Sequence, residues 1–426
     1  MSRPLAVLCL AAGLGKRTKV SIPKVLLPLC GRTLVGCALD AAQGLNPDRV
    51  IVVLHHQKEK VQKALADRPG LVCVDQGAPR GTGHAVQVAM QALGDFDGDV
   101  VVVYGDCPLM TTATLQALRE VRGTAPCAAL TALLEDPSGM GRILRDDEDR
   151  FVGIREHKDC TPDELAIDEI NAGFYCFDAA ALRPALARLK PNNAQGEYYL
   201  TDVIADFVSQ GAELPTLTLD EPTEVLGVNS LTDLALARSH MQDRILLEHL
   251  ANGVIITDPA TTFIDSNVKI GPDTRVLPCT VIGTGCVVGA NCEVGPFAHL
   301  RAGTVLEDGA EVGNFVEAKK TRMGKGAKAK HLTYLGDATI GAKANIGAGT
   351  ITANYDGVHK HETHVGEGAF IGSGSVLVAP VTIGDHALTG AGAIVKPHSK
   401  VGAGEVWVGV PARMLKPRVM PQRKEH

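Results

Sequence analysis

The sequence predicts a two-part fold, a Rossmann-like α/β domain with a mostly parallel sheet followed by a parallel β-helix. In the second half, apolar residues recur at every sixth position from Ile264 to Val312 and again, in a shifted frame, from Val365 to Trp407. In the first half, continuous apolar runs alternate with stretches of helical spacing. The length of 426 residues is itself too great for one hydrophobic core.

The six-residue period fits neither a helix nor an ordinary strand. It is typical of a coiled parallel β-helix, in which each short strand supplies one inward apolar side chain and a tight corner follows. Glycine often follows the apolar residue, as in Ile282-Gly283, and it suits such corners because it has no Cβ to clash where φ is positive. A β-sandwich, the alternative, would show a period of two and longer turn spacing. The repeat resembles the left-handed β-helix of hexapeptide acyltransferases, and this resemblance implies a homotrimer.

The first half has the rhythm of βαβ units. Its apolar runs are continuous, as expected of strands that are buried on both faces of a sheet. Such a doubly wound sheet binds its ligands beyond the carboxyl ends of the strands. We expect strands at 5–10, 50–54, 100–104 and 128–134, and helices at 33–43 and 83–93.

Composition excludes several classes of partner. The formal net charge is −6 and there is no long basic run, which argues against nucleic acid or an anionic membrane as the main partner. No apolar segment reaches the roughly 18 residues of a membrane span, and the first residues lack a signal-peptide pattern. The 11 cysteines are scattered without a Cys-x-x-Cys pair, so we expect reduced thiols in the cytoplasm.

A glycine-rich turn follows the first predicted strand. Backbone N–H groups of such a turn bind phosphate oxygens, and Arg17 and Lys24 add positive charge for a triphosphate. The segment Leu10-Ala11-Ala12-Gly13-Leu14-Gly15-Lys16-Arg17, with Pro23-Lys24 after it, resembles the N-terminal signature of sugar-1-phosphate nucleotidyltransferases. That resemblance implies that Leu10, Ala11, Ala12, Gly13 and Lys24 bind the nucleotide and that Arg17 and Lys24 serve catalysis. The chain departs from the family at Lys16, where threonine is common.

Asp106 follows the third predicted strand directly, in Tyr104-Gly105-Asp106. A carboxylate at this edge suits Mg²⁺ bound to nucleotide phosphates. The alternative is a turn aspartate ahead of a helix that begins near Thr111.

Further segments resemble the branch of the family that uses UTP and N-acetylglucosamine-1-phosphate. Each of these residues alone could equally be a polar group in a loop or helix cap. The resemblance implies that Gln76, Gly81 and Thr82 recognise uracil and that Tyr104 and Gly105 also contact substrate. It implies that Gly141, Glu156 and Asn171 hold the sugar. It also implies that Asn229 binds Mg²⁺ together with Asp106. We expect no proton-transfer role for His84.

The join between the domains has helical apolar spacing from Leu231 to Leu250. We therefore expect domains at 1–229 and 252–426, with a linker helix at 230–251.

The six-residue repeat is interrupted around 319–335 and over 352–364. Interruptions of a solenoid are usually loops on one face, and loops on rigid scaffolds often carry function. The segment Gly313 to Lys320, followed by His331 to Asp337, resembles the acetyltransferase site of bifunctional UDP-N-acetylglucosamine pyrophosphorylase/glucosamine-1-phosphate acetyltransferases.

Acetyl transfer to an amine requires a base, and histidine suits that role because its free pKa is about 6.5. We assign His331, with Glu317 as a possible orienting partner. Arg301 and Lys319 would hold the sugar phosphate by charge-assisted hydrogen bonds, and Tyr334 and Asn345 would position the sugar. The resemblance implies further that Lys360 assists at the sugar and that acetyl-CoA is bound by Asn354, Tyr355, Ser373 and Ala391.

Two features fit the family less closely. His359, His361 and His364 do not have a recognised zinc spacing, and solvated loop histidines are the better interpretation. Gly409-Val410-Pro411-Ala412-Arg413 differs from the Ser-Arg-Val-Pro ending of the bifunctional family, so a CoA phosphate contact could fall to Arg413 or Arg418.

The resemblance implies a bifunctional enzyme that requires Mg²⁺, UTP and acetyl-CoA and acts on small sugar phosphates, as a homotrimer with acetyltransferase sites at the subunit interfaces. One alternative is a uridylyltransferase whose β-helix only assembles trimers. The other is a non-catalytic regulatory subunit, against which the retention of Asp106, Asn229, Arg17 and Lys24 argues.

Overall fold

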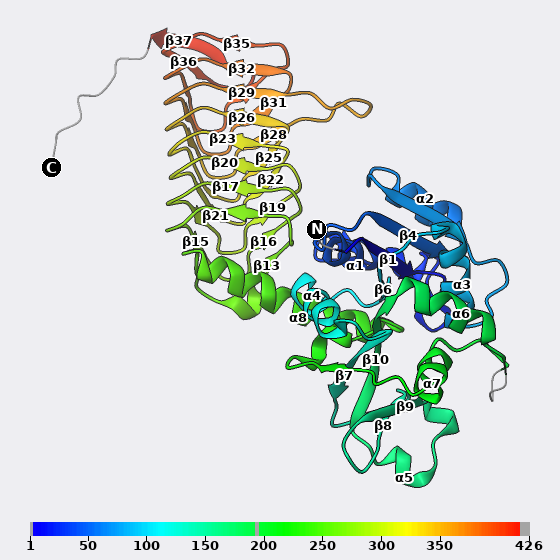
Figure 1. Ribbon diagram of the computed structural model, residues 1–426. Coiled ribbons are helices and arrows are strands. Elements are labelled where there is room, and N and C mark those ends of the chain that lie inside the picture. The colour runs from blue at the N-terminus through cyan, green and yellow to red at the C-terminus, as the bar shows by residue number, and fades with distance from the viewer. Residues whose placement is uncertain (1–2, 192–195, 418–426) are drawn as a thin grey trace. The chain divides into compact units, whose positions relative to one another are not determined.

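The computed structural model describes residues 3–191 and 196–417. It divides into two compact units, Met1–His240 and Met241–His426, and the boundary falls within the long helix α8 (Leu231–Ala251). Figure 1 shows an α/β unit in blue to green and a stacked β-helix in green to red. None of the helices in the described ranges combines the length and apolar character needed to cross a bilayer.

The first unit contains a nine-stranded sheet with the order β11-β7-β10-β6-β1-β4-β5, in which β8 pairs with β10 and β9. The central strands β6, β1, β4 and β5 are parallel, whereas β10 runs antiparallel to β6 and β7. The strands are β1 (Leu5–Leu10), β2 (Pro28–Leu29), β3 (Arg32–Thr33), β4 (Arg49–Leu54), β5 (Leu71–Asp75), β6 (Asp99–Tyr104), β7 (Cys127–Leu133), β8 (Arg142–Arg145), β9 (Phe151–Arg155), β10 (Glu169–Asp178) and β11 (Thr216–Thr218).

Helices cover both faces of this sheet. Alternate residues of β1 point to opposite faces, so Leu5, Val7 and Cys9 join one apolar core and Ala6, Leu8 and Leu10 the other. The first core is covered by α1, α2 and α4, and the second by α3, α6 and α7. The helices are α1 (Leu34–Gln43), α2 (Lys58–Leu65), α3 (Thr82–Leu93), α4 (Thr112–Arg122), α5 (Pro162–Leu165), α6 (Ala179–Arg188) and α7 (Thr201–Ser209), with short 3-10 helices η1 (Lys16–Thr18), η2 (Lys24–Leu26), η3 (His157–Asp159) and η4 (Pro222–Val225).

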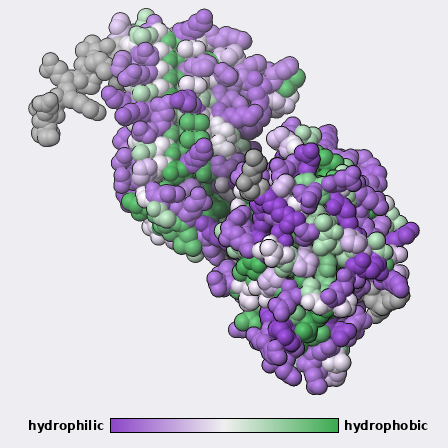
Figure 2. All heavy atoms as spheres, in the orientation of Figure 1, coloured by the Kyte–Doolittle hydropathy of each residue, from purple (hydrophilic) through white to green (hydrophobic). Residues whose placement is uncertain are grey.

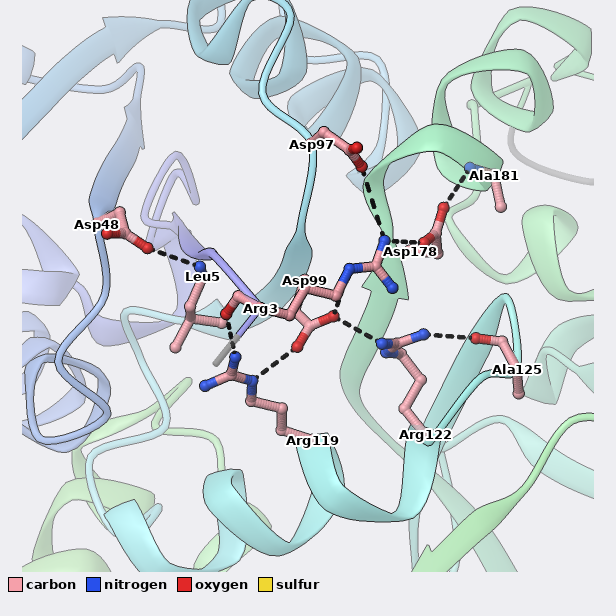
Figure 3. Close-up of polar contacts among 10 residues, drawn as sticks. All are labelled: Arg3, Leu5, Asp48, Asp97, Asp99, Arg119, Arg122, Ala125, Asp178 and Ala181. Atoms are coloured by element: carbon pink, nitrogen blue, oxygen red, sulfur yellow. Dashed lines mark hydrogen bonds and ion pairs between the residues drawn. The ribbon is translucent and has the colours of Figure 1, made fainter. Parts of the chain in front are cut away.

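A buried charge network holds the amino end of β6 (Figure 3). Asp99, its first residue, accepts hydrogen bonds from Arg119 Nε at 2.7 Å and Arg122 Nη2 at 2.6 Å, and Arg3 pairs with Asp178 at the end of β10. Paired in this way, the Asp99 carboxylate can remain charged although it is only 4% exposed. The network joins β6, β10 and α4 at the end of β6 opposite to Asp106.

The second unit is a left-handed parallel β-helix built from three sheets. Each strand pairs with the strand three further along the chain, so Ile264 lies opposite Ile282 and Ile282 opposite Leu300. One regular coil therefore takes 18 residues, which is three times the six-residue period. This spacing confirms the β-helix that the period predicted. Of the predicted inward residues, Ile270 and Trp407 are only partly buried.

We call these the first, second and third β-helix sheets. The first contains β12 (Ile255–Ile256), β15 (Arg275–Val276), β18 (Glu293–Val294), β21 (Glu311–Asn314), β24 (Lys328–His331), β27 (Asn345–Ile346), β30 (Phe370–Ile371), β33 (Leu388–Thr389), β36 (Glu405–Val408) and β37 (Arg413–Pro417). The second contains β13 (Phe263–Ile264), β16 (Val281–Ile282), β19 (His299–Leu300), β22 (Glu317–Lys319), β25 (Tyr334–Gly336), β28 (Ile351–Ala353), β31 (Val376–Val378) and β34 (Ile394–Val395). The third contains β14 (Lys269–Ile270), β17 (Val287–Val288), β20 (Val305–Leu306), β23 (Arg322–Met323), β26 (Ala338–Ile340), β29 (Thr363–Val365), β32 (Val381–Ile383) and β35 (Lys400–Val401), while the 3-10 helix η5 (Pro259–Thr261) precedes β13.

After the first coil, in which η5 lengthens the step from Ile256 to Ile264, the irregular steps of the β-helix occur at the corner between the second and third sheets, which we call the 2–3 corner. The inward residues Ala318 and Met323 are five positions apart, as are Leu335 and Ile340, whereas Thr352 and Val365 are thirteen apart. The predicted drift over 319–335 is thus the loss of single residues at one corner. The predicted loop is shorter than expected, because residues 352–353 and 363–364 belong to β28 and β29.

The first coil of the β-helix is closed by the second half of α8. Gln242 Nε2 donates to Ile264 O at 2.8 Å, and Ile264 N donates to Gln242 Oε1 at 3.1 Å. This buried amide therefore satisfies backbone groups of β13 that have no preceding coil to bind.

Candidate active sites

The first candidate site is centred on Lys24, Asp106 and Asn229, which are far apart in the sequence. Lys24 Nζ donates to Asp106 Oδ2 at 2.5 Å and to Asn229 Oδ1 at 3.1 Å. Lys24 opens η2, Asp106 follows β6, and Asn229 precedes α8. The lysine is only 8% exposed, so its charge is held in place by the carboxylate and the amide.

The glycine-rich turn packs directly against Lys24. Gly15 has φ 62°, and a Cβ at this position would lie 2.9 Å from Lys24 Cβ, so only glycine fits both the conformation and the space. A Cβ at Gly13 would make an ordinary contact of 3.6 Å with the end of the same lysine. Arg17 is exposed in the short helix η1, and the side chain of Lys16 lies outside the described part of the structure.

A cavity of about 650 Å³ opens beside Asp106 and Asn229. Six residues predicted from the sequence line it, together with the loop from Asp136 to Met140, Cys107, Leu134 and Leu226. The six are Tyr104, Asp106, Gly141, Glu156, Asn171 and Asn229.

Asn171 and Glu156 present polar groups to this cavity. Asn171 Oδ1 accepts hydrogen bonds from Tyr175 Oη at 2.9 Å and Gly173 N at 3.0 Å, which fixes the amide. Burial raises the pKa of Glu156 above its usual value, although a hydrogen bond from Thr201 Oγ1 at 3.2 Å acts in the opposite direction. Burial also raises the pKa of the Tyr104 hydroxyl, which therefore stays protonated as a donor.

Two supporting residues were not predicted. Arg142 is buried and donates from Nη1 to Pro137 O at 2.7 Å and Met140 O at 2.5 Å, which holds the loop that lines the cavity. Asp233 Oδ2 accepts from the backbone N–H groups of Asn229 and Ser230 at 2.9 and 2.8 Å. The spacing Ser230-x-x-Asp233 signals such a cap, whereas nothing in the sequence indicates that Arg142 is buried.

The segment predicted to recognise uracil follows β5 and is not among the residues lining that cavity. Gln76 Nε2 donates to Gly81 O at 3.1 Å. Gly81 has φ 101°, and a Cβ there would lie 2.5 Å from Tyr198 O, so glycine is required. Thr82 begins α3, and its Oγ1 accepts from Leu200 N at 3.2 Å. Gly105 N donates to Leu10 O at 2.9 Å and links the two predicted strand ends.

The second candidate site is a cluster of cations at the 2–3 corner of the β-helix. Lys360 lies on the loop over this corner. Its hydrogen bond to Lys319 and the repulsion between the two charges lower the pKa of Lys319, and repulsion from Arg301 lowers it further. Arg301 Nη1 pairs with Glu317 Oε1 at 2.7 Å. Three cations therefore gather beside two carboxylates, Glu317, which is paired with Arg301, and Asp337, whose charge acts on Lys319. The excess of positive charge favours an anionic ligand.

The loop from Asn354 to Glu362 is held by its own polar contacts. Asn354 Nδ2 donates to Asp337 Oδ2 at 2.5 Å, and Tyr355 forms an antiparallel bridge with Lys360. His361 Nε2 lies 2.7 Å from Asp356 Oδ2. Hydrogen bonds from the backbone of His359, from His361 and from the backbone of Val358 hold the pKa of Asp356 well below its usual range.

His331 lies at the preceding corner, between the first and second sheets, which we call the 1–2 corner. It is exposed at the end of β24, opposite Asn314. Ser373 and Ala391 follow β30 and β33 on later coils of the same corner, where Gly392 N donates to Ser373 O. Tyr334 and Glu317 lie side by side in the second sheet, between the two corners.

Within one chain, then, the predicted residues of the second site are divided. Arg301, Lys319 and Lys360 come together, whereas His331 lies at the other edge of the second sheet and Asn345 belongs to the first sheet. Glu317 pairs with Arg301. Two arginines near the C-terminus were predicted as alternatives for the contact to the CoA phosphate. Arg413 is exposed in β37, and Arg418 lies outside the described residues.

Family models and curated relatives match both units. A model described as MobA-like NTP transferase domain matches residues 7–205, one described as bacterial transferase hexapeptide (six repeats) matches 261–296 and 362–404, and one described as hexapeptide repeat of succinyl-transferase matches 279–314.

Several curated proteins named bifunctional protein GlmU are similar to the chain over most of its length. That of Kineococcus radiotolerans is 43% identical over 99% of this chain and 91% of the relative. Those of Trichlorobacter lovleyi and Heliobacterium modesticaldum are 43% and 44% identical, and each alignment covers 92% of this chain and 93% of the relative. The chain therefore belongs to the GlmU family of bifunctional enzymes, in which a nucleotidyltransferase unit precedes a hexapeptide-repeat transferase unit.

Proposed function

We propose that the chain makes UDP-N-acetylglucosamine in two steps. Residues 252–426 transfer acetyl from acetyl-CoA to glucosamine-1-phosphate, and residues 1–229 then transfer uridylyl from UTP to the product and release pyrophosphate, with 230–251 as the linker. The observation that carries the proposal is the convergence of Lys24, Asp106 and Asn229 beside a cavity lined by the predicted sugar contacts.

Asp106 and Asn229 fit the Mg²⁺ that this reaction uses. Asp106 Oδ2 and Asn229 Oδ1 both lie within hydrogen-bond distance of the same Lys24 ammonium, so two hard oxygen ligands converge on one cation. Mg²⁺ prefers such oxygens and completes its coordination with water and substrate phosphates. When bound, Mg²⁺ would neutralise negative charge on the triphosphate.

The chain's own groups mainly align the two phosphates. A phosphate oxygen of the sugar phosphate attacks the α-phosphorus of UTP, a new P–O bond forms, and pyrophosphate leaves with the bonding electrons. Lys24 and Arg17 stabilise charge on the phosphates, the turn at Gly13 donates backbone hydrogen bonds, and Asn171 and Glu156 hold the sugar. Positioning and electrostatics of this kind account for most of the catalysis in phosphoryl-type transfers.

In the second site His331 acts as the base. It takes a proton from the substrate amine, the amine attacks the thioester carbon, a C–N bond forms and the C–S bond breaks. The leaving sulfur takes up the proton from His331, so CoA leaves as the thiol. Arg301, Lys319 and Lys360 bind the sugar phosphate, and Tyr334 and Asn345 position the sugar. Asn354, Tyr355, Ser373 and Ala391 bind acetyl-CoA.

The β-helix forms a homotrimer in the cytoplasm, with acetyltransferase sites at its subunit interfaces. The division of the predicted residues between two corners supports this arrangement, because a neighbouring copy could supply the missing side of each site.

Two assays on the purified chain test the proposal. Pyrophosphate release from UTP and N-acetylglucosamine-1-phosphate measures the first site, and free thiol release from acetyl-CoA and glucosamine-1-phosphate measures the second. We expect Asp106→Ala to abolish only pyrophosphate release and His331→Ala to abolish only thiol release. If the parent chain releases pyrophosphate but no thiol, the β-helix serves only assembly. If His331→Ala leaves thiol release unchanged, another group is the base.

A further inference from the structure

The amide of Gln76 is held by two neighbours. Its Nε2 donates to Gly81 O at 3.1 Å and lies 3.4 Å from His84 Nδ1. Gln76 is only 6% exposed. His84 lies in the first turn of α3, three residues after Gly81. The contact joins a residue expected to face the base to a histidine for which the sequence suggested no role.

Gly81 and His84 determine the orientation of the Gln76 amide, that is, the positions of its NH₂ group and of Oε1. A backbone carbonyl can only accept a hydrogen bond, so the group beside Gly81 O must be the amide NH₂. His84 Nδ1 then accepts the second N–H of the same NH₂ group, which requires a neutral imidazole with its proton on Nε2. Burial, and to a lesser extent Arg80, lower the pKa of His84 and favour this neutral form.

Both donors of the Gln76 amide are therefore used within the protein. Its remaining group is Oε1, which can only accept a hydrogen bond. Uracil presents an N3–H donor on its pairing edge, whereas cytosine presents an N3 lone pair flanked by an amino group. An acceptor held toward the base binds the first and repels the second.

We propose that His84 is a positioning residue that sets the preference for uracil over cytosine by holding the Gln76 amide with Oε1 toward the base. This inference rests on the proposed function, because it takes Gln76 to face the base of the bound nucleotide. Without His84, only the hydrogen bond to Gly81 O holds the amide, so the amide turns more easily and can also present its NH₂ group to cytosine. The base preference then weakens even though Gln76 is retained.

The test compares UTP with CTP in the pyrophosphate-release assay on the full chain. We expect His84→Ala to reduce the ratio of kcat/KM for UTP over CTP about tenfold, the effect of losing one hydrogen bond of about 1.4 kcal/mol. The loss should be in KM for UTP, with kcat nearly unchanged. His84→Leu, which keeps more of the side-chain volume, should behave in the same way, while His84→Asn, whose Oδ1 can accept in place of Nδ1, should retain most of the ratio.

A purely structural role predicts a different result. In that case His84→Ala and His84→Leu lower activity with UTP and CTP by the same factor, the ratio is unchanged, and the inference is overturned. It is also overturned if His84→Asn loses the ratio as fully as His84→Leu. A parent chain without activity on UTP would instead contradict the proposed function itself.

Discussion

At the scale of single residues, the uridylyl transfer that we propose depends most directly on the ammonium group of Lys24. Lys24→Met keeps a similar length of stem and removes the ammonium that lies between Asp106 and Asn229. We expect pyrophosphate release to fall by about 10²–10³-fold, the usual cost of removing one preorganised hydrogen-bond donor. Thiol release should not change. Lys63→Met, on the exposed face of α2, is the matched control and should leave both activities intact.

Glu156 gives the first unit a dependence on pH. Burial raises the pKa of its carboxyl from 4.5, with Asp159 and Asp202 contributing, so the folded state holds this proton to a higher pH than the unfolded state does. The stability associated with the proton is present below pH 4.5 and is lost as the pH rises through the raised pKa. Glu156→Gln removes the titration. The thermal midpoint of the first unit should therefore exceed that of the parent at pH 7 and match it near pH 4.5; an equal gap at both would contradict this assignment.

The sequence predicts which residues come together where those residues belong to motifs in a fixed order. Lys24, Asp106 and Asn229 were assigned to one site by their motifs, and they converge although 205 positions separate the first from the last. The burial of Arg142 could not be predicted, because arginine is usually exposed and its carbonyl partners become apparent only when the loop is folded. The contact of His84 with Gln76 depends in the same way on the path of the chain between β5 and α3.

At the scale of elements, the loop over the 2–3 corner is an insertion that the β-helix does not need for its coil. Thr352 and Val365 are thirteen positions apart where a regular step is six. Deleting residues 355–361 restores that step, so the stacking of β28 and β29 on neighbouring coils should persist. The deletion removes Tyr355 and Lys360. We expect thiol release to be lost, while the thermal midpoint of the β-helix changes by only a few degrees and pyrophosphate release is unchanged.

Retention of thiol release after this deletion would contradict the role of the loop. Collapse of the β-helix would instead show that the loop is part of the solenoid's stability. Tyr355→Phe is a milder companion, because it removes only the hydroxyl that donates to Gly357 O.

The strands of the β-helix could be predicted almost residue by residue, because each coil repeats the same inward position and an error in register would expose every apolar residue of a strand. The drift over 319–335 could not be interpreted from the sequence. A five-residue step reads as lost periodicity along the chain, and only the stacked coils assign both such steps to one corner.

At the scale of the whole molecule, we propose that exposed apolar residues at the 1–2 corner form the contact between copies of the chain. Figure 2 shows apolar residues in a band along the β-helix unit. Phe297, Phe315 and Leu332 occupy successive coils of this corner with exposed fractions of 49%, 56% and 64%, and the two phenylalanine rings stack with centroids 5.1 Å apart. We define these three residues as the apolar ridge.

The backbone makes the ridge residues unusual. All three have positive φ, between 50° and 55°, a conformation that costs a bulky residue roughly 1–2 kcal/mol. Later coils of the same corner place glycine there, as at Gly349 and Gly374. Large apolar side chains kept at a strained and exposed position are best explained by burial against another copy.

Replacing all three ridge residues with glycine tests this explanation, because glycine relieves the strained φ while it removes the apolar contact. We expect each β-helix to stay folded, with a thermal transition that no longer depends on protein concentration. The mass in sedimentation should fall from about three times 44.8 kDa to 44.8 kDa. Val287→Ser, at an exposed apolar site on the third sheet, should leave the assembly intact. Pyrophosphate release should survive in the ridge variant and thiol release should be lost, since in the proposed trimer the neighbouring copy completes the acetyltransferase site. A ridge variant that keeps the trimer mass would place the interface elsewhere, and a monomer that still releases thiol would mean that one chain completes the acetyltransferase site.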